Sequence, residues 1–415
     1  MELDTGVTAW MLTSASFVLL MTPGLAFFYG GMSRAKSVLN MMMMSFGVMG
    51  VVGVIYVLWG WSMSYADQSV GGIFGNPFEQ FGLAGAMTDA DGAWVMADGL
   101  PVIVDVGFQV TFAIITTALI SGALAERVKF STWLVFVGFW VTLSYFPMAH
   151  MVWGGGLLSD EGPFASIAEP IDFAGGTVVH INAGVAALVL ALVIGKRKGF
   201  GSEPMRPHNL PFVMLGAALL WFGWFGFNAG SAYGADGLAG LAWVNTTTAT
   251  ASAICGWLIV EKLRDGHPTS LGAASGIVAG LVAITPAAGD VSPVGAIAVG
   301  AVSGILCAMA VGLKFKLGYD DSMDVVGVHL VGGLVGTVIL GFLATDGGLF
   351  YGGGISLLIV QILIALVAIV FSGVITFLIA IALKATMGWR VTEPDEISGI
   401  DSVEHGETAY EPITR

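Results

Sequence analysis

The sequence predicts an all-α membrane protein with eleven transmembrane helices. Of its 415 residues, 56% are hydrophobic and only 11% are charged, whereas about 25% of the residues of a soluble domain are charged. The hydrophobic residues gather in long runs such as 102–124 and 355–383. As helices, such runs can cross about 30 Å of hydrocarbon, and they lack the alternation of polar and apolar residues that marks barrel strands. The lipid bilayer is therefore the expected solvent of most of the chain.

The predicted spans follow one another along the whole chain. Each contains roughly 20 predominantly apolar residues, the length that a spanning helix needs. The eleven segments are 8–30, 38–63, 101–124, 130–150, 173–195, 210–230, 238–261, 271–286, 293–314, 325–345 and 355–384. Because the number is odd, the two ends of the chain are expected on opposite sides of the membrane.

Lysine and arginine residues predict which end lies inside the cell, because cytoplasmic loops carry an excess of positive charge. All fifteen fall on one side: Arg34, Lys36, Arg127, Lys129, Lys196, Arg197, Lys198, Arg206, Lys262, Arg264, Lys314, Lys316, Lys384, Arg390 and Arg415. The loops on the other side carry only acids, for example Asp67, Glu79, Asp98 and Asp160. We therefore expect a multi-pass protein of the inner (plasma) membrane with its N-terminus outside and its C-terminus inside.

No soluble domain is expected. The longest outer loop, 64–100, is rich in glycine and acids. We expect residues 1–384 to form one membrane domain and residues 385–415 a cytoplasmic tail. The first helix follows Glu2 and Asp4 without a basic segment, which favours a retained first span over a cleaved signal peptide.

The spans are expected to form an inverted repeat. Helices 1–5 and 6–10 each contain an odd number of spans, so the second five-helix half is inverted relative to the first, and helix 11 is peripheral. The fifth helix carries Asp172 and His180, and the tenth carries Asp324 and His329. At 1.5 Å per residue, His180 lies about 12 Å below Asp172, and His329 lies about 7 Å from the cytoplasmic end of its helix. The two imidazole rings are therefore expected to meet near the middle of the bilayer.

These two histidines are candidate pore residues. An ionisable ring in a membrane span needs a polar partner and usually faces the interior of the bundle. A hydrogen bond between helices is the structural alternative. A pair of rings that shares one proton stays neutral and offers both a donor and an acceptor to a small polar solute.

Polar and aromatic side chains gather near the predicted outer mouth. Asp172 is a good N-cap for the fifth helix, and its charge also favours a cation nearby, so both roles remain open. Ring faces attract cations, although any single ring can instead contact lipid or belong to the interfacial belt. The side chains concerned are Phe108, Phe112, Trp153, Trp224 and Phe227, with Ser231 one helical turn beyond Phe227.

Enzyme motifs are missing from the sequence. The chain has no HExxH pair, no Gly-x-Ser-x-Gly elbow and no phosphate loop. Cys255 and Cys307 lie within predicted helices and show no metal or disulfide spacing. We expect no catalysis, cofactor or metal, and no buried cluster of carboxylates of the sort that coordinates a metal or relays protons through a pump.

Six sequence motifs, in order along the chain, resemble those of the ammonium transporter (Amt) family of the Amt/Mep/Rh superfamily. They are Phe108-Gln-Val-Thr-Phe112, Ala149-His-Met-Val-Trp-Gly-Gly-Gly156, Asp172-Phe-Ala-Gly-Gly-Thr-Val-Val-His180, Gly223-Trp-Phe-Gly-Phe-Asn-Ala-Gly-Ser231, Thr285-Pro-Ala-Ala-Gly289 and Asp324-Val-Val-Gly-Val-His329. The resemblance runs from the first helix to the tail. It implies a homotrimer of eleven-helix protomers, each with its own pore.

The resemblance also implies a role for each matching position. The implied roles are recruitment of substrate by Trp153, Ser231 and Phe112, a gate of Phe112 and Phe227, a pore pair of His180 and His329, stabilisation of the outer site by Asp172, and nearby positions for Gln109, Trp224 and Thr285. The implied function is transport of ammonium, with methylammonium as an analogue.

Elementary electrostatics agrees with the family on how such a pore works. Moving a small cation into a low-dielectric medium costs tens of kcal/mol in the Born limit, whereas a cation–π contact contributes about 2 kcal/mol. Ammonium is therefore expected to lose its proton after the gate and to cross as ammonia. Potassium has no proton to lose and is excluded. Whether the proton crosses separately stays open.

Two alternatives and one partner complete the expectations. An ammonium-sensing transceptor would have the same pore motifs, and a Rh-like gas channel is disfavoured because Trp153 and Ser231 indicate a cation-recruiting mouth.

The resemblance implies that a PII-type signalling protein docks on the cytoplasmic face. There we expect a basic rim beside an acidic tail that is packed rather than solvated. The rim residues are Arg34, Arg127, Lys196 to Lys198 and Lys314.

Overall fold

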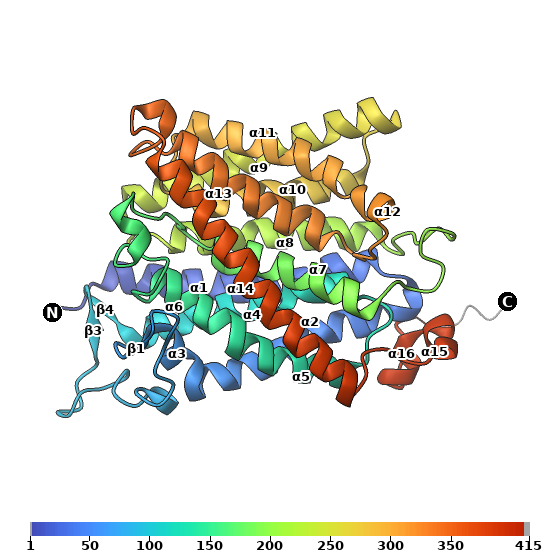
Figure 1. The fold of residues 1–415 in the computed structure, drawn as a ribbon, viewed down its shortest axis with the longest axis horizontal. Helices are drawn as coiled ribbons and strands as arrows, with labels where there is room; N and C mark the ends of the chain where they lie inside the picture. The colour runs from blue at the N-terminus through green and yellow to red at the C-terminus, as the bar shows by residue number, and fades with distance from the viewer. Residues whose placement is uncertain (1, 411–415) are drawn as a thin grey trace.

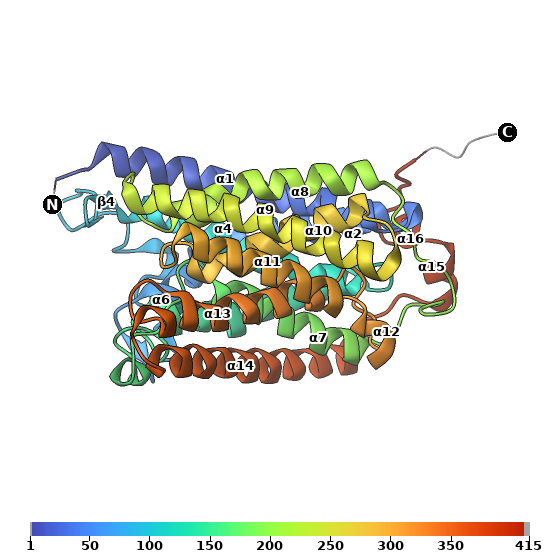
Figure 2. The same cartoon turned by 90° about the horizontal axis from the view of Figure 1, so that it is seen from above.

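The structure, a computed structural model, describes residues 2–410. Most helices run along the long axis of the molecule and pack side by side (Figures 1 and 2). The start of α1 lies at one end of this axis, and the short helices α15 and α16 lie at the other (Figure 1). We call these the N-terminal end and the tail end.

Helices account for nearly all of the regular structure. The α-helices are α1 (Thr5–Met32), α2 (Val38–Ile55), α3 (Trp61–Tyr65), α4 (Val102–Ile120), α5 (Phe130–Trp140), α6 (Phe146–Trp153), α7 (Asn182–Ile194), α8 (Leu210–Trp224), α9 (Gly237–Asp265), α10 (Ser270–Ile284), α11 (Pro293–Ala310), α12 (Leu313–Leu317), α13 (Val331–Leu343), α14 (Ser356–Thr386), α15 (Glu393–Ser398) and α16 (Ile400–Glu404). Short 3₁₀ turns are η1 (Ala35–Ser37), η3 (Phe81–Leu83), η4 (Ser121–Leu124), η6 (Pro163–Ser166), η9 (Thr285–Ala287) and η11 (Leu349–Tyr351). The loop before α4 contains two antiparallel strand pairs, β1 (Ser69–Val70) with β2 (Phe74–Gly75) and β3 (Met96–Ala97) with β4 (Leu100–Pro101).

The observed helices coincide with the predicted spans. Within the described residues, ten helical stretches are long and apolar enough to cross a membrane. The first covers Thr5–Met32 where 8–30 was expected, and the last covers Ser356–Thr386 where 355–384 was expected. At the remaining predicted position lies α9, which is 29 residues long but more polar than the others because it contains Asn245 and neighbouring threonines.

Five π-helical turns interrupt the spans. They are η2 (Tyr56–Gly60), η5 (Val141–Tyr145), η7 (Gly176–Ile181), η8 (Phe225–Ala229) and η10 (Val326–Leu330). Such turns are rare in proteins overall, and those that occur often lie at functional sites. Three of them carry the predicted pore residues His180 and His329 and the predicted gate residue Phe227.

Glycine residues let neighbouring helices approach closely. A Cβ atom on Gly300 of α11 would lie 2.0 Å from the carbonyl oxygen of Ala249 on α9. A Cβ atom on Gly216 of α8 would lie 2.3 Å from the backbone nitrogen of Phe28 on α1. Small residues permit this backbone-to-backbone packing within membranes, so only glycine fits at these two positions.

Positive charge gathers at the tail end. Every lysine and arginine within residues 2–410 lies there, where α1, α7, α9, α12 and α14 end (Figure 1). Ion pairs join several of these loops, including Arg34 with Glu126 and Lys198 with Glu393. The one-sided distribution agrees with the sequence-based assignment, although Arg415 lies outside the described residues.

The tail packs against the loops, as predicted, over its described part. Trp389 is buried and its indole N–H donates to the carbonyl oxygen of Ala380 over 2.9 Å. The Asp401 carboxylate accepts backbone N–H groups from Leu39 and Asn40 at the start of α2, over 2.9 and 2.8 Å. Glu404 likewise accepts the backbone N–H of α5 at its first residue. The tail therefore fixes the starts of two spans; its acid Glu411 lies outside the described residues.

Two buried carboxylates at the tail end are each paired with an arginine. Asp320 is fully buried 2.9 Å from Nε of Arg197 and 4.0 Å from the guanidinium of Arg127, and Glu126 accepts a hydrogen bond from Arg34 over 2.6 Å. Burial lowers the pKa of Arg127 to about 10. Burial opposes ionisation of Asp320, yet Arg197 and Arg127 hold its pKa below the ordinary value. Asp320 and Arg197 are 123 residues apart, so a sequence pattern does not reveal their pairing.

The predicted basic rim is only partly present. Arg127 and Lys314 are buried and paired rather than displayed. Lys196 and Lys198 are exposed. A guanidinium or ammonium that neutralises a buried carboxylate is not free to attract a partner, which is why the loop charges overstate the rim.

Candidate functional site

His180 and His329 meet inside the bundle, as predicted. Their Nδ1 atoms are 3.2 Å apart, and their rings stack with centroids 5.4 Å apart and planes 25° from parallel. Both side chains are buried. The π-helical turns η7 and η10 present the two rings to each other from the fifth and tenth spans.

A line of aromatic rings leads from the histidines toward the N-terminal end. The ring of His180 lies 5.5 Å from Trp224 and 6.3 Å from Phe227, centroid to centroid. Phe227 stacks on Phe112 at 4.1 Å with an angle of 27° between the planes. Phe112 in turn meets Trp153 edge-on at 6.2 Å. The predicted gate pair is therefore in direct contact, directly beside the first histidine.

Beyond the Phe112 and Phe227 pair lies a cavity of about 350 Å³, which we call the aromatic cavity. Its lining includes the predicted Phe112, Trp153 and Ser231 together with Gln109. Four further lining residues were not predicted: Tyr65, Asp105, Phe173 and Tyr233. An acid in the first turn of an apolar span, one turn before Gln109, is a signal by which Asp105 can be found in the sequence.

Local hydrogen bonds fix the cavity wall. The Ser231 hydroxyl donates to the carbonyl oxygen of Phe227 over 2.8 Å, which leaves its oxygen lone pairs available to a solute. The indole N–H of Trp153 donates to the backbone carbonyl of Asp172 over 2.9 Å. The indole N–H of Trp224 donates to Thr285 over 2.9 Å, so Thr285 orients an aromatic ring and does not line the cavity.

Asp172 acts as the predicted helix cap. Its carboxylate accepts backbone N–H groups of Gly175, Thr177 and Val178 over 2.9, 2.9 and 3.3 Å. Burial raises the pKa of this carboxyl above its ordinary value, and the hydrogen bonds from Thr177, Gly176 and Val178 oppose that rise. Asp172 does not line the aromatic cavity, so it acts on the site through the helix start and through Trp153.

The counterpart of Asp172 in the second half is Asp321, and the sequence-based pairing with Asp324 is wrong. Asp321 precedes His329 by eight residues, as Asp172 precedes His180. Its carboxylate accepts the backbone N–H groups of Val325 and Val326 over 3.0 and 2.7 Å. Asp324 instead pairs with Lys314 over 2.7 Å. The sequence suggested Asp324 as the counterpart because it lies in the same motif as His329. The hydrogen bonds to the helix start instead identify Asp321, eight positions before the histidine.

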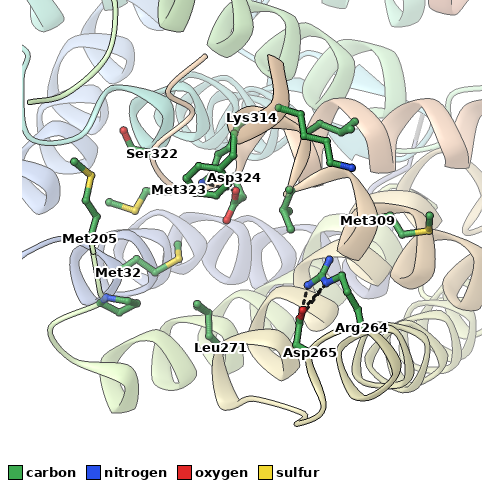
Figure 3. Close-up of a pocket in the computed structure, with 16 residues that line it drawn as sticks. Met32, Met205, Arg264, Asp265, Leu271, Met309, Lys314, Ser322, Met323 and Asp324 are labelled. Carbon is green, nitrogen blue, oxygen red and sulfur yellow. Dashed lines mark hydrogen bonds and ion pairs between the residues drawn. The ribbon is translucent and has the colours of Figure 1, made fainter. Parts of the chain in front are cut away.

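A second cavity, of about 530 Å³, opens at the tail end (Figure 3). We call it the tail-end cavity. Met32, Met205 and Met323 line one side of it, and the ion pair of Arg264 and Asp265 lies on another side (Figure 3). Asp324 and Lys314 also contribute to its lining. Within the described residues no group of three or more His, Cys, Asp or Glu side chains could hold a metal ion.

Comparison with known proteins gives one consistent result. The profile of the Ammonium Transporter Family matches residues 9–410. The chain is 57% identical to an ammonium transporter of Mycobacterium bovis, over 98% of this chain and 91% of that protein. It resembles the crystal structure of Mep2 from Candida albicans with a TM-score of 0.87 and 32% identity, over 100% of this chain and 93% of that one.

A sensor Amt protein is also similar, with a TM-score of 0.87 and 30% identity, over 96% of this chain and 98% of that one. The family match covers nearly the whole chain, and the relatives named as ammonium transporters are not enzymes. The chain therefore belongs to the ammonium transporter family.

Proposed function

We propose that this ammonium transporter captures NH₄⁺ in the aromatic cavity, releases a proton and passes ammonia along a column of rings. This ring column consists of Phe112, Phe227, His180 and His329. The observation that carries the proposal is the continuity of that column, in which each ring lies within 6.3 Å of the next. The aromatic cavity suits a charged solute, and the buried imidazole pair beyond the Phe112 and Phe227 rings suits a neutral one. The arrangement therefore fits a solute that loses its charge between the two places.

The loss of the proton follows from the cost of burying charge. The Phe112 and Phe227 rings touch, so a solute that passes them leaves its water behind. Desolvation of a small cation costs far more than the roughly 2 kcal/mol of a cation–π contact. Ammonia carries no charge and avoids this cost. Potassium cannot lose its charge, which gives the selectivity.

The histidine pair supplies hydrogen bonds to the neutral solute. At 3.2 Å, one Nδ1 donates and the other accepts, so the two rings share a single proton at this contact. Nε2 of His180 is buried and has no hydrogen-bond partner among residues 2–410. It therefore remains available to ammonia, either as a donor or as an acceptor according to the tautomer.

The membrane arrangement is part of the proposal. We place eleven spans in the bilayer by counting the 29-residue helix α9, with the N-terminal end outside the cell and the tail end in the cytoplasm of a plasma-membrane homotrimer. The lysines and arginines at the tail end support this orientation. The equal spacing of Asp172 to His180 and of Asp321 to His329 supports two inverted halves, with α14 peripheral to both.

A PII-type protein is the proposed cytoplasmic partner, with residues 1–384 as the transport domain and 385–415 as a regulatory tail. The tail-end cavity offers a concave surface on that face, into which a loop of the partner can insert. Exposed Lys196 and Lys198 lie beside the packed tail. The contacts of Asp401 and Glu404 with the starts of α2 and α5 connect the tail to the spans.

Sensing is the second candidate function, favoured by the similarity to a sensor Amt protein. A Rh-like gas channel fits less well, because the cavity holds Trp153 and Ser231, which suit a cation. The test records both ammonium uptake and current for the purified protein in liposomes under an ammonium gradient and, separately, a potassium gradient, because ammonia that crosses without its proton carries no current. We expect ammonium alone to drive flux. Binding of ammonium without any flux would favour the sensor, and equal potassium flux would contradict the proposed pore.

A further inference from the structure

The aromatic cavity contains a carboxylate that the proposed mechanism does not use. Asp105 lies in the first turn of α4 and lines this cavity. The Tyr233 hydroxyl donates to its Oδ1 atom over 2.7 Å, and the Gln109 side-chain amide donates to that hydroxyl oxygen over 2.6 Å. The three side chains form a chain of hydrogen bonds along one wall. Phe108 holds the Tyr233 ring edge-on at 5.7 Å.

We infer that Asp105, Gln109 and Tyr233 form an anionic subsite for a monovalent cation, and that it binds ammonium and small primary alkylammonium ions. The inference rests on the proposed function, because it concerns how the same cavity captures its substrate. It adds a charged contact to the ring faces and to the Ser231 hydroxyl. We call it the carboxylate subsite.

Free acceptor atoms point to a ligand. Gln109 is 7% exposed, and its buried Oε1 atom has no hydrogen-bond partner among residues 2–410. The buried hydroxyl of Tyr65, which also lines the cavity, is likewise unpartnered within that range. Among the described residues only Tyr233 donates to Asp105, and it does so at Oδ1, so Oδ2 is left for another donor. An ammonium ion has N–H groups in four directions and can satisfy such oxygens together.

The charge balance of the N-terminal end supports the same assignment. Every described lysine and arginine lies at the tail end, so none of them can neutralise Asp105. A partly buried carboxylate without a counter-ion is costly, because its desolvation is not offset by an opposite charge. A cation from solution supplies that charge.

A purely structural role explains the contacts less well. An acid in the first helical turn favours the helix dipole, and many such acids accept backbone N–H groups there. Asp172 does so, but Asp105 accepts the phenol of Tyr233 from a different segment. The hydrogen bond from Tyr233 thus holds the Asp105 carboxylate against the cavity wall rather than against its own helix.

The test uses Asp105→Asn in the full-length protein in liposomes, with ammonium flux measured over a range of ammonium concentrations. Asparagine keeps the size and removes the charge. We expect the half-saturating concentration to rise about tenfold, which corresponds to about 1.4 kcal/mol, while the maximal flux is retained. Competition by external potassium should weaken in the same variant, because a carboxylate attracts any monovalent cation. Asp67→Asn, which removes an exposed acid from the same end, is the matched control and should behave like the wild type.

A second variant keeps the test decisive if Asp105→Asn folds poorly. Tyr233→Phe retains the ring but no longer holds the carboxylate, and we expect a rise of about threefold in the half-saturating concentration. An unchanged value in Tyr233→Phe together with an unchanged or unfolded Asp105→Asn overturns the inference. So does a loss of maximal flux in Asp105→Asn without a change in half-saturation.

The outcome also separates this inference from the proposed function. If Trp153→Ala with Ser231→Ala weakens capture but Asp105→Asn does not, the carboxylate subsite is wrong and the aromatic cavity stands. If none of these variants weakens capture, the proposed substrate site itself is wrong.

Discussion

The Nδ1 atoms of His180 and His329 lie 3.2 Å apart, so a single proton serves both rings at this contact. We expect His180→Ala or His329→Ala to impair ammonium flux or its selectivity over potassium, because either change leaves the other imidazole unpaired in the pore. Flux of ammonium and potassium into liposomes measures this, and the size of the purified oligomer shows that assembly is intact. His267→Ala, at an exposed loop position, is the control. Wild-type flux and selectivity in both pore variants would remove the role.

Trp153 lines the aromatic cavity from the end of α6, and Ser231 lines it from the turn after η8. We expect Trp153→Ala combined with Ser231→Ala to weaken capture of ammonium or methylammonium at low concentration, since the ring face and the hydroxyl oxygen together replace lost water. The effect should shrink at saturating substrate. Trp94→Ala is a suitable control, because Trp94 is 60% exposed in the loop before α4. An unchanged apparent affinity in the double variant places capture elsewhere.

Removal of the tail should change both transport and partner binding. Truncation after Gly388 deletes the Trp389, Asp401 and Glu404 contacts that fix loops at the tail end. We expect an altered basal flux and weaker binding of a cognate PII protein, measured on the same preparation. Truncation after Tyr410, which retains these contacts, is the comparison. A protein cut after Gly388 that transports and binds like the full chain contradicts the docking role of the tail.

Two adjacent aspartates should respond to pH with opposite signs. Burial and then the charge of Asp324 raise the pKa of Asp321 to about 6, against the opposing charge of Lys314. Its contribution to stability is therefore present below the ordinary carboxyl pKa of about 3.9 and is lost as pH rises toward 6. Asp320, whose pKa is lowered despite burial by Arg197 and Arg127, contributes stability above that ordinary value and loses it as the pH falls.

Melting temperatures of detergent-solubilised protein between about pH 3 and pH 7 test these signs. The difference between Asp321→Asn and the wild type should move in favour of the variant as pH rises. As pH rises over the acidic part of that range, the melting temperature of Asp320→Asn should fall relative to that of the wild type. The same pH trend in both variants contradicts the assignment.

The positions of the spans were predictable because the bilayer requires a particular length of apolar helix. The observed α4 begins at Val102 and α14 ends at Thr386, each within two residues of the expectation. The π-helical turns were not predictable, because they depend on packing between spans rather than on the composition of one span. The turn around His180, for example, places Gly176 against Pro286 from another span.

The site was predictable where a rare residue type marked it. His180 and His329 are conspicuous because ionisable side chains are uncommon within spans. Tyr233 was not found, because a tyrosine near the end of a span usually belongs to the interfacial belt, and only its bond to Asp105 distinguishes it. Asp321 was missed for a different reason: its role depends on which carboxylate reaches two backbone N–H groups, and three aspartates lie close together in the sequence.

The buried ionic group at the tail end has a consequence for biosynthesis. The Arg127 guanidinium donates to the carbonyl oxygen of Asp320, which is made 193 residues later, and the backbone oxygen of Arg127 accepts the N–H of Val391, which is later still. At about 5 to 20 residues per second, a ribosome needs about 10 to 40 s to supply the first of these partners. Throughout that interval the early spans are already in the translocon or the bilayer, while this arginine lacks its Asp320 partner. The contacts at the tail end thus form last, after the final span has been inserted.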